Sequence, residues 1–459
     1  MNNIVIRGGQ VVTSEGVAAA DIAIAGEKIE LVATDISGPA RMEIDATGLH
    51  IFPGVIDAHV HFNEPGRTEW EGIETGSKSV AAGGGTLFFD MPLNAHPPTL
   101  DAESFQLKRR AAEAASFVDF ALWGGLTPSN LDRLEELAQC GVIGFKAFMC
   151  DSGIDDFPSI DERSLREGMK RAASLNLPVA VHAESESITA RLKGEAIARD
   201  ARAYLDSRPI AAELAAIGGA IELAGETGCQ LHVVHVSCAA GVRLISEGRR
   251  ANVNVTCETC PHYLTLTCED VERLGGIAKC APPLRSATER ELLWDELLAQ
   301  RIQTIGSDHS PSPSEMKQSS DFFKVWGGIS GAQQLLPLIL SRGNFPLISR
   351  VVSTNVAQIF RLPGKGRIAA GFDADLTLVK VNGEFEIKKE DLFYRHPQSP
   401  YIGRHVTARV ERTFLRGQTI FRDGTIIGKA AGRLILRACF KTQETPALTL
   451  TCTLQRVPL

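Results

Sequence analysis

Two histidines one residue apart end an apolar run, and this pair is the first candidate for chemistry. The run spans residues 54–61 and closes with His59-Val60-His61. Successive side chains on a strand alternate between faces, so residues i and i+2 project to the same side and both rings can converge on one point. Neutral imidazole is the commonest protein ligand for metals, so the pair predicts a metal site, with a structural or surface pair as the alternative.

Four further apolar runs carry a residue that could bind a metal at or near their ends. They are Val142 to Lys146, Pro178 to His182, Leu231 to His235 and Gln303 to Asp308. In a barrel of parallel strands the active site lies at the C-terminal ends of the strands, so these residues would face one mouth. Residues i and i+3 on a strand face opposite ways, so we take His235 as the candidate and His232 as a packed histidine.

A lysine at the end of a core strand requires an explanation, because a buried ammonium costs several kcal/mol unless something compensates it. One interpretation of Lys146 is a salt bridge at the barrel mouth. The other is that its neutral, desolvated amine reacts with CO₂ to give a carbamate, a carboxylate-like anion that can bridge two cations. The first cation would then have the ligands His59, His61, Lys146 and Asp308, and the second would have Lys146, His182 and His235.

These ligand types predict two divalent cations. Imidazole with oxygen ligands suits Zn²⁺ best, and Mn²⁺ or Co²⁺ are alternatives. Such ions would make water nucleophilic near neutral pH and polarise a carbonyl. Asp308, at the rim, would accept the proton of the attacking water and pass it to the leaving nitrogen. The pattern predicts metal-assisted hydrolysis of an amide-like bond.

Two patterns of apolar residues in the sequence predict the strands and helices that position these residues. Between residues 51 and 364, apolar runs alternate with helical stretches such as Glu103 to Ala115 and Ala211 to Gly225. This alternation predicts an α/β fold with a (β/α)₈ TIM barrel. Short alternating strands lie on both sides of the barrel, at 3–7, 10–13, 21–25 and 28–32 and again at 375–380, 406–415, 418–421 and 425–427. We therefore predict a small β-sandwich domain formed from both chain ends, residues 1–50 and 365–437.

The tail and the overall composition set further limits. Residues 438–459 match neither pattern, and we leave them out of the fold as a disordered or vector-derived tail. The 459 residues are 44% hydrophobic and 22% charged, as in a soluble globular protein. A net charge of -7 argues against a nucleic-acid partner, and no apolar stretch approaches the ~20 residues of a membrane span. Ten scattered cysteines indicate a reducing cytoplasm, and Cys257 with Cys260 is a packed pair in preference to a redox or zinc site.

In combination the motifs resemble those of the amidohydrolase superfamily and, within it, the cyclic amidases: allantoinases, dihydropyrimidinases (hydantoinases) and dihydroorotases. The resemblance runs from residue 1 to about 437. It implies a binuclear metal centre at the six positions above, a carboxylated Lys146, proton transfer by Asp308 and a homotetramer. It is carried by the segments 59–61, 144–146, 181–184, 232–237 and 306–311.

The loops distinguish the members of this group. Asn63 stands where dihydroorotases carry an Arg that binds the carboxylate of their substrate, and Asp151 stands where hydantoinases carry a Tyr that supports the oxyanion. The segments that look like allantoinase are 63–72, 91–94, 148–153, 258–264, 279–285 and 326–331. This resemblance implies a small-molecule substrate, allantoin, opened to allantoate, with Asn94, Ala281 and Gly327 lining the substrate site. The alternative for Asn94 is an ordinary turn residue.

Three other functions stay open from the sequence. The nearest is a dihydropyrimidinase or hydantoinase, which performs the same chemistry on a less polar ring substituent. A non-catalytic assembly protein on this fold would have lost metal ligands, whereas all six positions here carry competent side chains. A mononuclear deaminase on the same barrel would lack the bridging lysine.

Overall fold

Parallel strands from the middle of the chain form a closed barrel. In chain order they are β6 (Val55–Val60), β7 (Gly85–Asp90), β8 (Asp119–Leu122) with its extension β9 (Gly124–Gly125), β10 (Phe145–Phe148), β11 (Val179–His182), β12 (Leu231–Val233), β13 (Val255–Thr259) and β14 (Thr304–Ile305). Each pairs with the next in parallel, and Ile143 N donates to Leu122 O at 2.8 Å where β8 passes to β10. The barrel closes where His61 N donates to His309 O at 2.7 Å.

The structure is a computed structural model, and it describes residues 2–342 and 344–438. The predicted tail therefore lies outside the described residues, apart from Ala438. None of the helices in the described part of the chain is both long and apolar enough to span a membrane.

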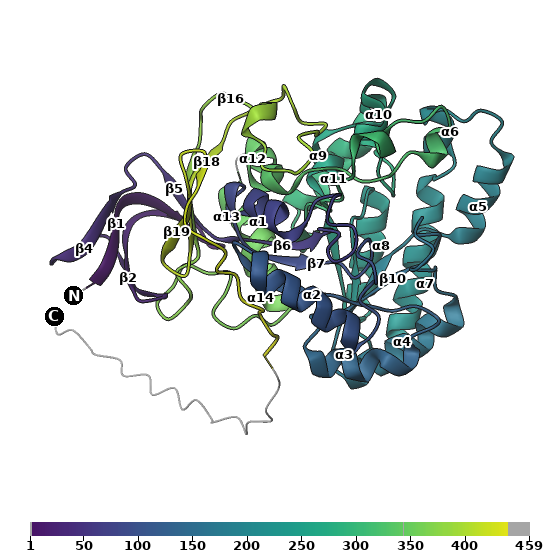
Figure 1. Ribbon diagram of the computed structural model, residues 1–459, viewed down its shortest axis with the longest axis horizontal. Helices are drawn as coiled ribbons and strands as arrows, with labels where there is room; N and C mark the ends of the chain where they lie inside the picture. The colour runs from purple at the N-terminus through teal and green to yellow at the C-terminus, as the bar shows by residue number, and fades with distance from the viewer. Residues whose placement is uncertain (1, 343, 439–459) are drawn as a thin grey trace, which may run out of the picture.

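Helices follow the strands and cover the outside of the barrel (Figure 1). Helix α4 shows why: Asp161 caps its first turn by accepting from Ser164 N, and Leu165, Met169 and Ala172 form a buried stripe with helical spacing. The outer helices are α1 (Ile73–Ala82), α2 (Ala102–Ala115), α3 (Leu134–Cys140), α4 (Glu162–Ser174), α7 (Ile210–Thr227), α8 (Ala239–Arg250), α11 (Ala287–Leu298), α12 (Leu335–Ile339), α13 (Phe345–Ser349) and α14 (Asn355–Ile359). Shorter helices lie in the loops: α5 (Glu186–Glu195), α6 (Ala201–Asp206), α9 (Pro261–Thr265) and α10 (Cys268–Leu274).

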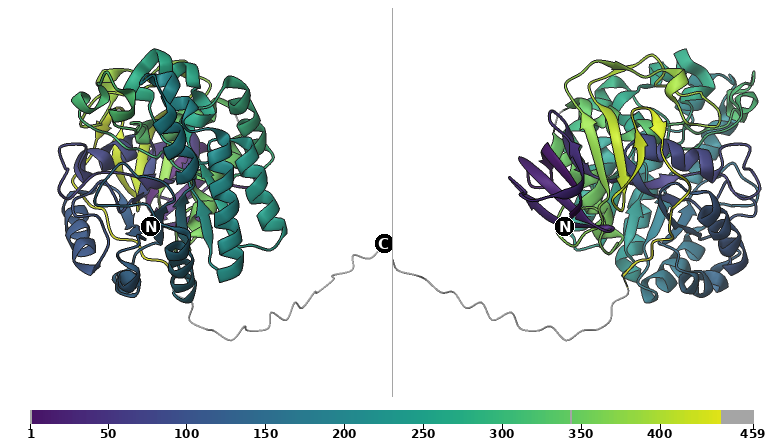
Figure 2. Two further views of the ribbon diagram at one scale, coloured as in Figure 1. Left: turned by 90° about the vertical axis from the view of Figure 1, so that its right-hand side faces the viewer. Right: turned by 60° about the vertical axis from the view of Figure 1, so that its left-hand side comes forward.

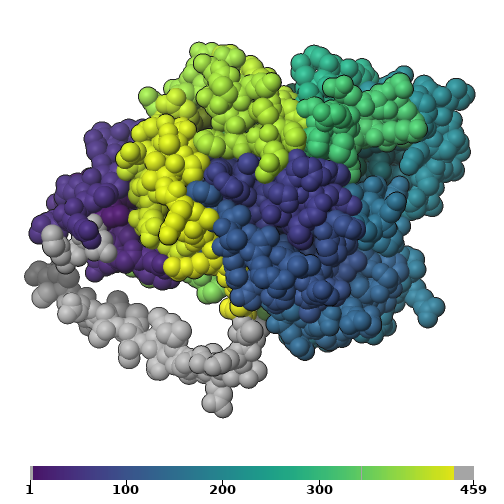
Figure 3. All heavy atoms as spheres, viewed as in Figure 1, coloured from purple at the N-terminus to yellow at the C-terminus, as the bar shows by residue number. Residues whose placement is uncertain are grey.

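The two ends of the chain share one nine-stranded sheet beside the barrel. The N-terminal strands are β1 (Asn2–Val12), β2 (Val17–Ala25), β3 (Lys28–Ala33), β4 (Ala40–Asp45) and β5 (His50–Pro53), and the C-terminal ones are β15 (Leu376–Lys380), β18 (Arg409–Leu415), β19 (Gln418–Arg422) and β20 (Thr425–Ile426). Strand β5 joins the two sets, since it pairs in parallel with β1 and antiparallel with β15. Figure 2 shows the purple and yellow strands side by side, and in Figure 3 the yellow residues lie between the purple strands and the blue part of the barrel. The predicted fold class, a TIM barrel with a small β-domain formed from both chain ends, is confirmed, and the strands predicted to form a β-sandwich lie in this one nine-stranded sheet.

One local prediction is wrong for a physical reason. The strands predicted at 3–7 and 10–13 are a single strand, β1, whose register shifts between Ile6 and Gly9. Gly8 has φ +71, a left-handed conformation that glycine adopts at little cost, so a β-bulge replaces the expected turn.

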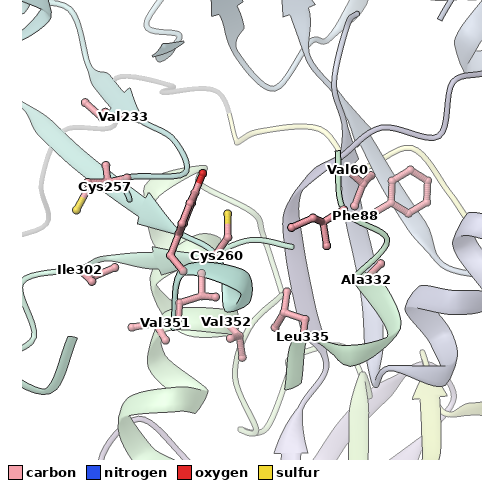
Figure 4. Packing of buried hydrophobic residues seen from close by; sticks show 14 of the residues in the cluster. Val60, Phe88, Val233, Cys257, Cys260, Ile302, Ala332, Leu335, Val351 and Val352 are labelled. Carbon is pink, nitrogen blue, oxygen red and sulfur yellow. The ribbon is translucent and has the colours of Figure 1, made fainter. Parts of the chain in front are cut away.

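The Cys-x-x-Cys pair belongs to the hydrophobic core, as the sequence favoured. Cys257 and Cys260 are both fully buried, and Figure 4 shows them among apolar residues that include Val233, Ile302 and Val351. Burial raises the pKa of Cys257 to about 12 and that of Cys260 well above its usual range, so both thiols stay protonated.

Candidate metal centre

The predicted ligands come from different strands and meet at the mouth of the barrel. His59 lies in β6 and His61 directly follows it, His182 ends β11, and His235 and Asp308 lie in the loops just after β12 and β14. All five are at most 9% exposed. The sixth residue, Lys146, has a different depth.

Lys146 lies inside β10, so the prediction that it ends a strand is wrong. The ladder begins one residue earlier, where Phe145 N donates to Pro178 O, and it pairs Lys146 with Ala180 and Phe148 with His182. Lys146 is therefore two residues deeper than His182, roughly 7 Å along the strand. Only a long side chain could reach from that depth to the level of the histidines.

Three candidate ligand atoms converge at the first half of the centre. His59 Nε2 lies 3.2 Å and His61 Nε2 lies 3.4 Å from Asp308 Oδ1. His59 Nδ1 lies 2.7 Å from Glu258 Oε1, and because a carboxylate only accepts, Nδ1 carries the hydrogen and Nε2 presents a lone pair. The lone pair of His59 Nε2 faces a carboxylate oxygen and repels it unless a cation lies between them, so this donor set fits a divalent metal.

The second half has a similar arrangement around His182 and His235. His182 Nε2 donates to Glu184 Oε2 at 2.7 Å, which leaves Nδ1 as the ligand atom. The two rings pack edge to face with centroids 4.6 Å apart. Burial lowers the pKa of His182 and holds that of His235 well below its usual value, so both rings are neutral, as metal binding requires.

Lys146 lies near both halves, and its amine has no partner among the described residues. Its side chain is fully buried, and among the described residues its Nζ has no hydrogen-bond partner and no carboxylate within ion-pair distance. Its Nζ lies 5.1 Å from the centroid of the Phe148 ring, which itself stacks on His182. Burial lowers the pKa of Lys146 to about 8. The salt-bridge interpretation of this lysine has no support, and an unpartnered buried amine is the group that a carbamate would complete.

Cys150, His182 and Glu184 form a second group with metal-ligand spacing, but its charges argue against a metal. Arg208 NH1 binds Glu184 Oε2 and neutralises that carboxylate. Burial raises the pKa of Cys150 to about 12, so its thiol is protonated. Glu184 instead orients His182, and the ligand atoms of His182 remain available to the main centre.

A cavity of about 780 Å³ is lined at its base by five of the candidate metal ligands, His59, His61, His182, His235 and Asp308. The three residues predicted to contact substrate, Asn94, Ala281 and Gly327, all line it. Asn94 has φ +68, so it is a turn residue as well as a lining one, and its Nδ2 lies 3.5 Å from Ser310 Oγ. Asp151 also lines the cavity, where its carboxylate lies 3.8 Å from Lys193 Nζ.

Comparisons with known proteins agree with this geometry. Residues 50–420 match the model of the amidohydrolase family. The chain belongs to the amidohydrolase family. It is 53% identical to the allantoinase of Rubrobacter xylanophilus, over 94% of this chain and 97% of that one. It is 50% identical to the allantoinase of Deinococcus radiodurans, over 94% and 98%.

Solved structures of cyclic-amide hydrolases also resemble this amidohydrolase over almost its whole length. The L-hydantoinase (dihydropyrimidinase) of Arthrobacter aurescens superimposes with a TM-score of 0.93 at 33% identity, over 95% of this chain and all of that one. The dihydropyrimidinase of Brevibacillus agri NCHU1002 gives 0.88 at 31% identity, over 95% and 99%. The chain is therefore an enzyme of a metal-dependent hydrolase family, as the sequence predicted.

Two carboxylates of this amidohydrolase were not assigned a role from the sequence. Glu258 orients His59, and Glu184 orients His182. A signal was present in both cases: Glu258 lies in the buried strand β13 and Glu184 lies two positions after the buried strand β11, where an unpaired carboxylate would be costly. Which ring Glu258 contacts could not be read from spacing, because Glu258 and His59 are 199 positions apart.

Proposed function

We propose that this amidohydrolase opens the hydantoin ring of allantoin to give allantoate. The observation that carries the proposal is the fully buried Nζ of Lys146, which has no partner among the described residues and lies near two pairs of histidines, of which His59 and His182 are each oriented by a carboxylate. A hydrolase of the same fold without a bridging group would have no use for an amine at that depth. The identity of about half of all residues to allantoinases supports allantoin over other cyclic amides.

The residues present would hold two divalent ions, Zn²⁺ by preference. His59, His61 and Asp308 would bind one ion, His182 and His235 the other, and the carbamate of Lys146 both. Ions bound there supply Lewis acidity, which polarises the substrate carbonyl and makes water a nucleophile at neutral pH.

The protein's own residues perform the proton transfer. Water adds to the ring carbonyl carbon, the C–N bond breaks, and the proton lost by water ends on the departing nitrogen. Asp308 lies at the junction of the cavity and the histidines, where its carboxylate can accept that proton and donate it. Glu258 and Glu184 keep His59 and His182 in the tautomers that present lone pairs.

Ring opening and metal content measured on one preparation test this proposal. The protein is purified in bicarbonate-containing buffer, its metal is quantified, and allantoin, unsubstituted hydantoin, dihydrouracil and dihydroorotate are compared as substrates. About two ions per chain with allantoin preferred supports the proposal. Two ions with hydantoin preferred would move the function to a hydantoinase, and no metal with no turnover would reject both. The predicted homotetramer and cytoplasmic location stay predictions.

A further inference from the structure

The loop that forms one wall of the cavity is held by two buried lysines. This wall loop spans residues 313–328 and supplies Val325, Trp326, Gly327 and Gly328 to the cavity lining. Lys279 and Lys317 are 4% and 8% exposed. Within residues 2–342 and 344–438, neither Nζ has a carboxylate within ion-pair distance, which is unusual for buried ammonium groups.

Both lysines donate hydrogen bonds to backbone carbonyls of the wall loop. Lys279 Nζ donates to Phe322 O at 2.8 Å, to Phe323 O at 3.3 Å and to Val325 O at 2.5 Å, which uses all three of its N–H groups. Lys317 Nζ donates to Trp326 O at 3.2 Å and to Gly328 O. These five hydrogen bonds from the two amino groups fix the path of the loop backbone.

Lys279 also belongs to the opposite wall of the cavity. Ala281, predicted to line the substrate site, is only two positions further along the chain. Lys279 O accepts from Gly328 N at 2.8 Å, so the two segments are joined by both the backbone and the side chain of this lysine. Tyr204 packs under the ammonium, with Nζ 4.5 Å from its ring centroid, and its hydroxyl donates to Cys280 O at 2.9 Å.

We propose that Lys279 is a positioning residue that sets the gap between the Ala281 wall and the Gly327 wall and thereby determines substrate affinity, with Lys317 fixing the far end of the same loop. This inference rests on the proposed function. A wall that contacts substrate equally before and during the reaction affects KM, whereas groups that act only in the transition state affect kcat. Lys279 touches neither the predicted ligands nor Asp308 by any hydrogen bond in the described part of the chain.

Lys279→Met tests the inference, because methionine keeps the length of the side chain and removes its donors. We expect KM for allantoin to rise about tenfold with kcat changed by less than about threefold and with metal content unchanged. Hydrogen exchange of residues 318–329 should become faster, while exchange in the barrel strands stays the same. Lys279→Arg, which keeps a cation, should restore part of the protection, and Lys170→Met on the exposed face of α4 serves as the matched control.

Several outcomes separate this inference from the proposed function. Unchanged exchange of 318–329, or a loss confined to kcat and metal, would overturn the positioning role. If Lys279→Met does not fold, Lys317→Met applies the same test through Trp326 and Gly328. If the wild-type protein opens no cyclic amide, the proposed function fails, and the exchange of residues 318–329 alone decides whether the lysines hold the wall.

Discussion

Lys146 and Lys365 are both buried lysines, but the protein surrounds them in opposite ways. Lys365 lies where the β-domain meets the barrel, with its Nζ 2.7 Å from carboxylates of Asp119 and Asp375 and 2.9 Å from Asp373. Burial alone would lower the pKa of Lys365, but Asp375, Asp119 and Asp373 raise it above its ordinary value. Lys146 has no such partner among the described residues, and burial lowers its pKa to about 8.

This difference in surroundings indicates a structural role for Lys365 and supports the proposed chemical role of Lys146. Asp119 lies in barrel strand β8 and Asp375 just before β15, so Lys365 ties the two parts of the fold together. A buried charge with its partners in place is stabilising only as long as none is removed. Lys146, in contrast, is desolvated without a compensating partner among the described residues, which supports the proposed carbamate.

The largest effect should follow from Lys146→Met. Turnover of allantoin should fall on the order of a thousandfold or more, because the bridging ligand is lost and with it most of the metal. The stability of the metal-free protein should not fall, since an uncompensated amine is replaced by an apolar side chain. Metal analysis and urea unfolding measure both effects, and full metal with full activity would refute the carbamate.

Asp308→Asn should leave the fold intact and reduce kcat by about a hundredfold to ten-thousandfold, because the amide cannot accept the proton of the attacking water. Thermal unfolding and steady-state kinetics check this, with Lys170→Met as a surface control. Activity close to that of the wild type would place proton transfer on another residue.

Lys365→Met is the counterpart of the Lys146 variant. It should lower the free energy of unfolding by about 3–5 kcal/mol, because it leaves the buried carboxylates of Asp119 and Asp375 with less compensation. Metal bound per folded chain should stay at the wild-type value. Loss of metal without loss of stability would mean that the two lysines do not divide their roles as their surroundings indicate.

Glu258→Gln should weaken metal binding about tenfold with little change in stability, because the ring of His59 keeps an acceptor but loses the negative charge behind it. Equilibrium dialysis against a metal buffer measures the affinity, and Glu222→Gln on the exposed face of α7 is the control. An unchanged affinity would remove Glu258 from the centre.

The smallest effect concerns the pH dependence of stability. The folded-state pKa of Lys365 is raised, so its contribution is present below the unfolded-state value of about 10.5 and is lost only as pH rises through the folded-state pKa. The stability difference between wild type and Lys365→Met should therefore stay constant from about pH 6 to about pH 9.

Burial lowers the pKa of Lys279 to about 7, so the unfolded state binds more protons above that pH. The wild type should then gain stability over Lys279→Met as pH rises, which urea unfolding at several pH values detects.

The sequence alone was enough to predict the fold class and to predict that the candidate ligands lie at one mouth of the barrel. It could do so because strand and helix periodicities are local, and because a parallel barrel places all C-terminal strand ends on one side. His59, His61, His182, His235 and Asp308 all lie at or beyond such ends. Their roles as ligands remain a proposal that the structure supports by geometry.

Only the tertiary structure decided which partners each buried charged group contacts and how deep in the barrel it lies. The partners of Lys365 are 246, 10 and 8 positions away, and those of Lys279 are 43 to 46 positions away. Nothing in a run of residues records whether a buried lysine meets carboxylates, carbonyls or no partner, since desolvation and Coulomb energies depend on distances between segments that the chain brings together only on folding. The strand register that sets Lys146 below His182 is fixed in the same way, by pairing with β11.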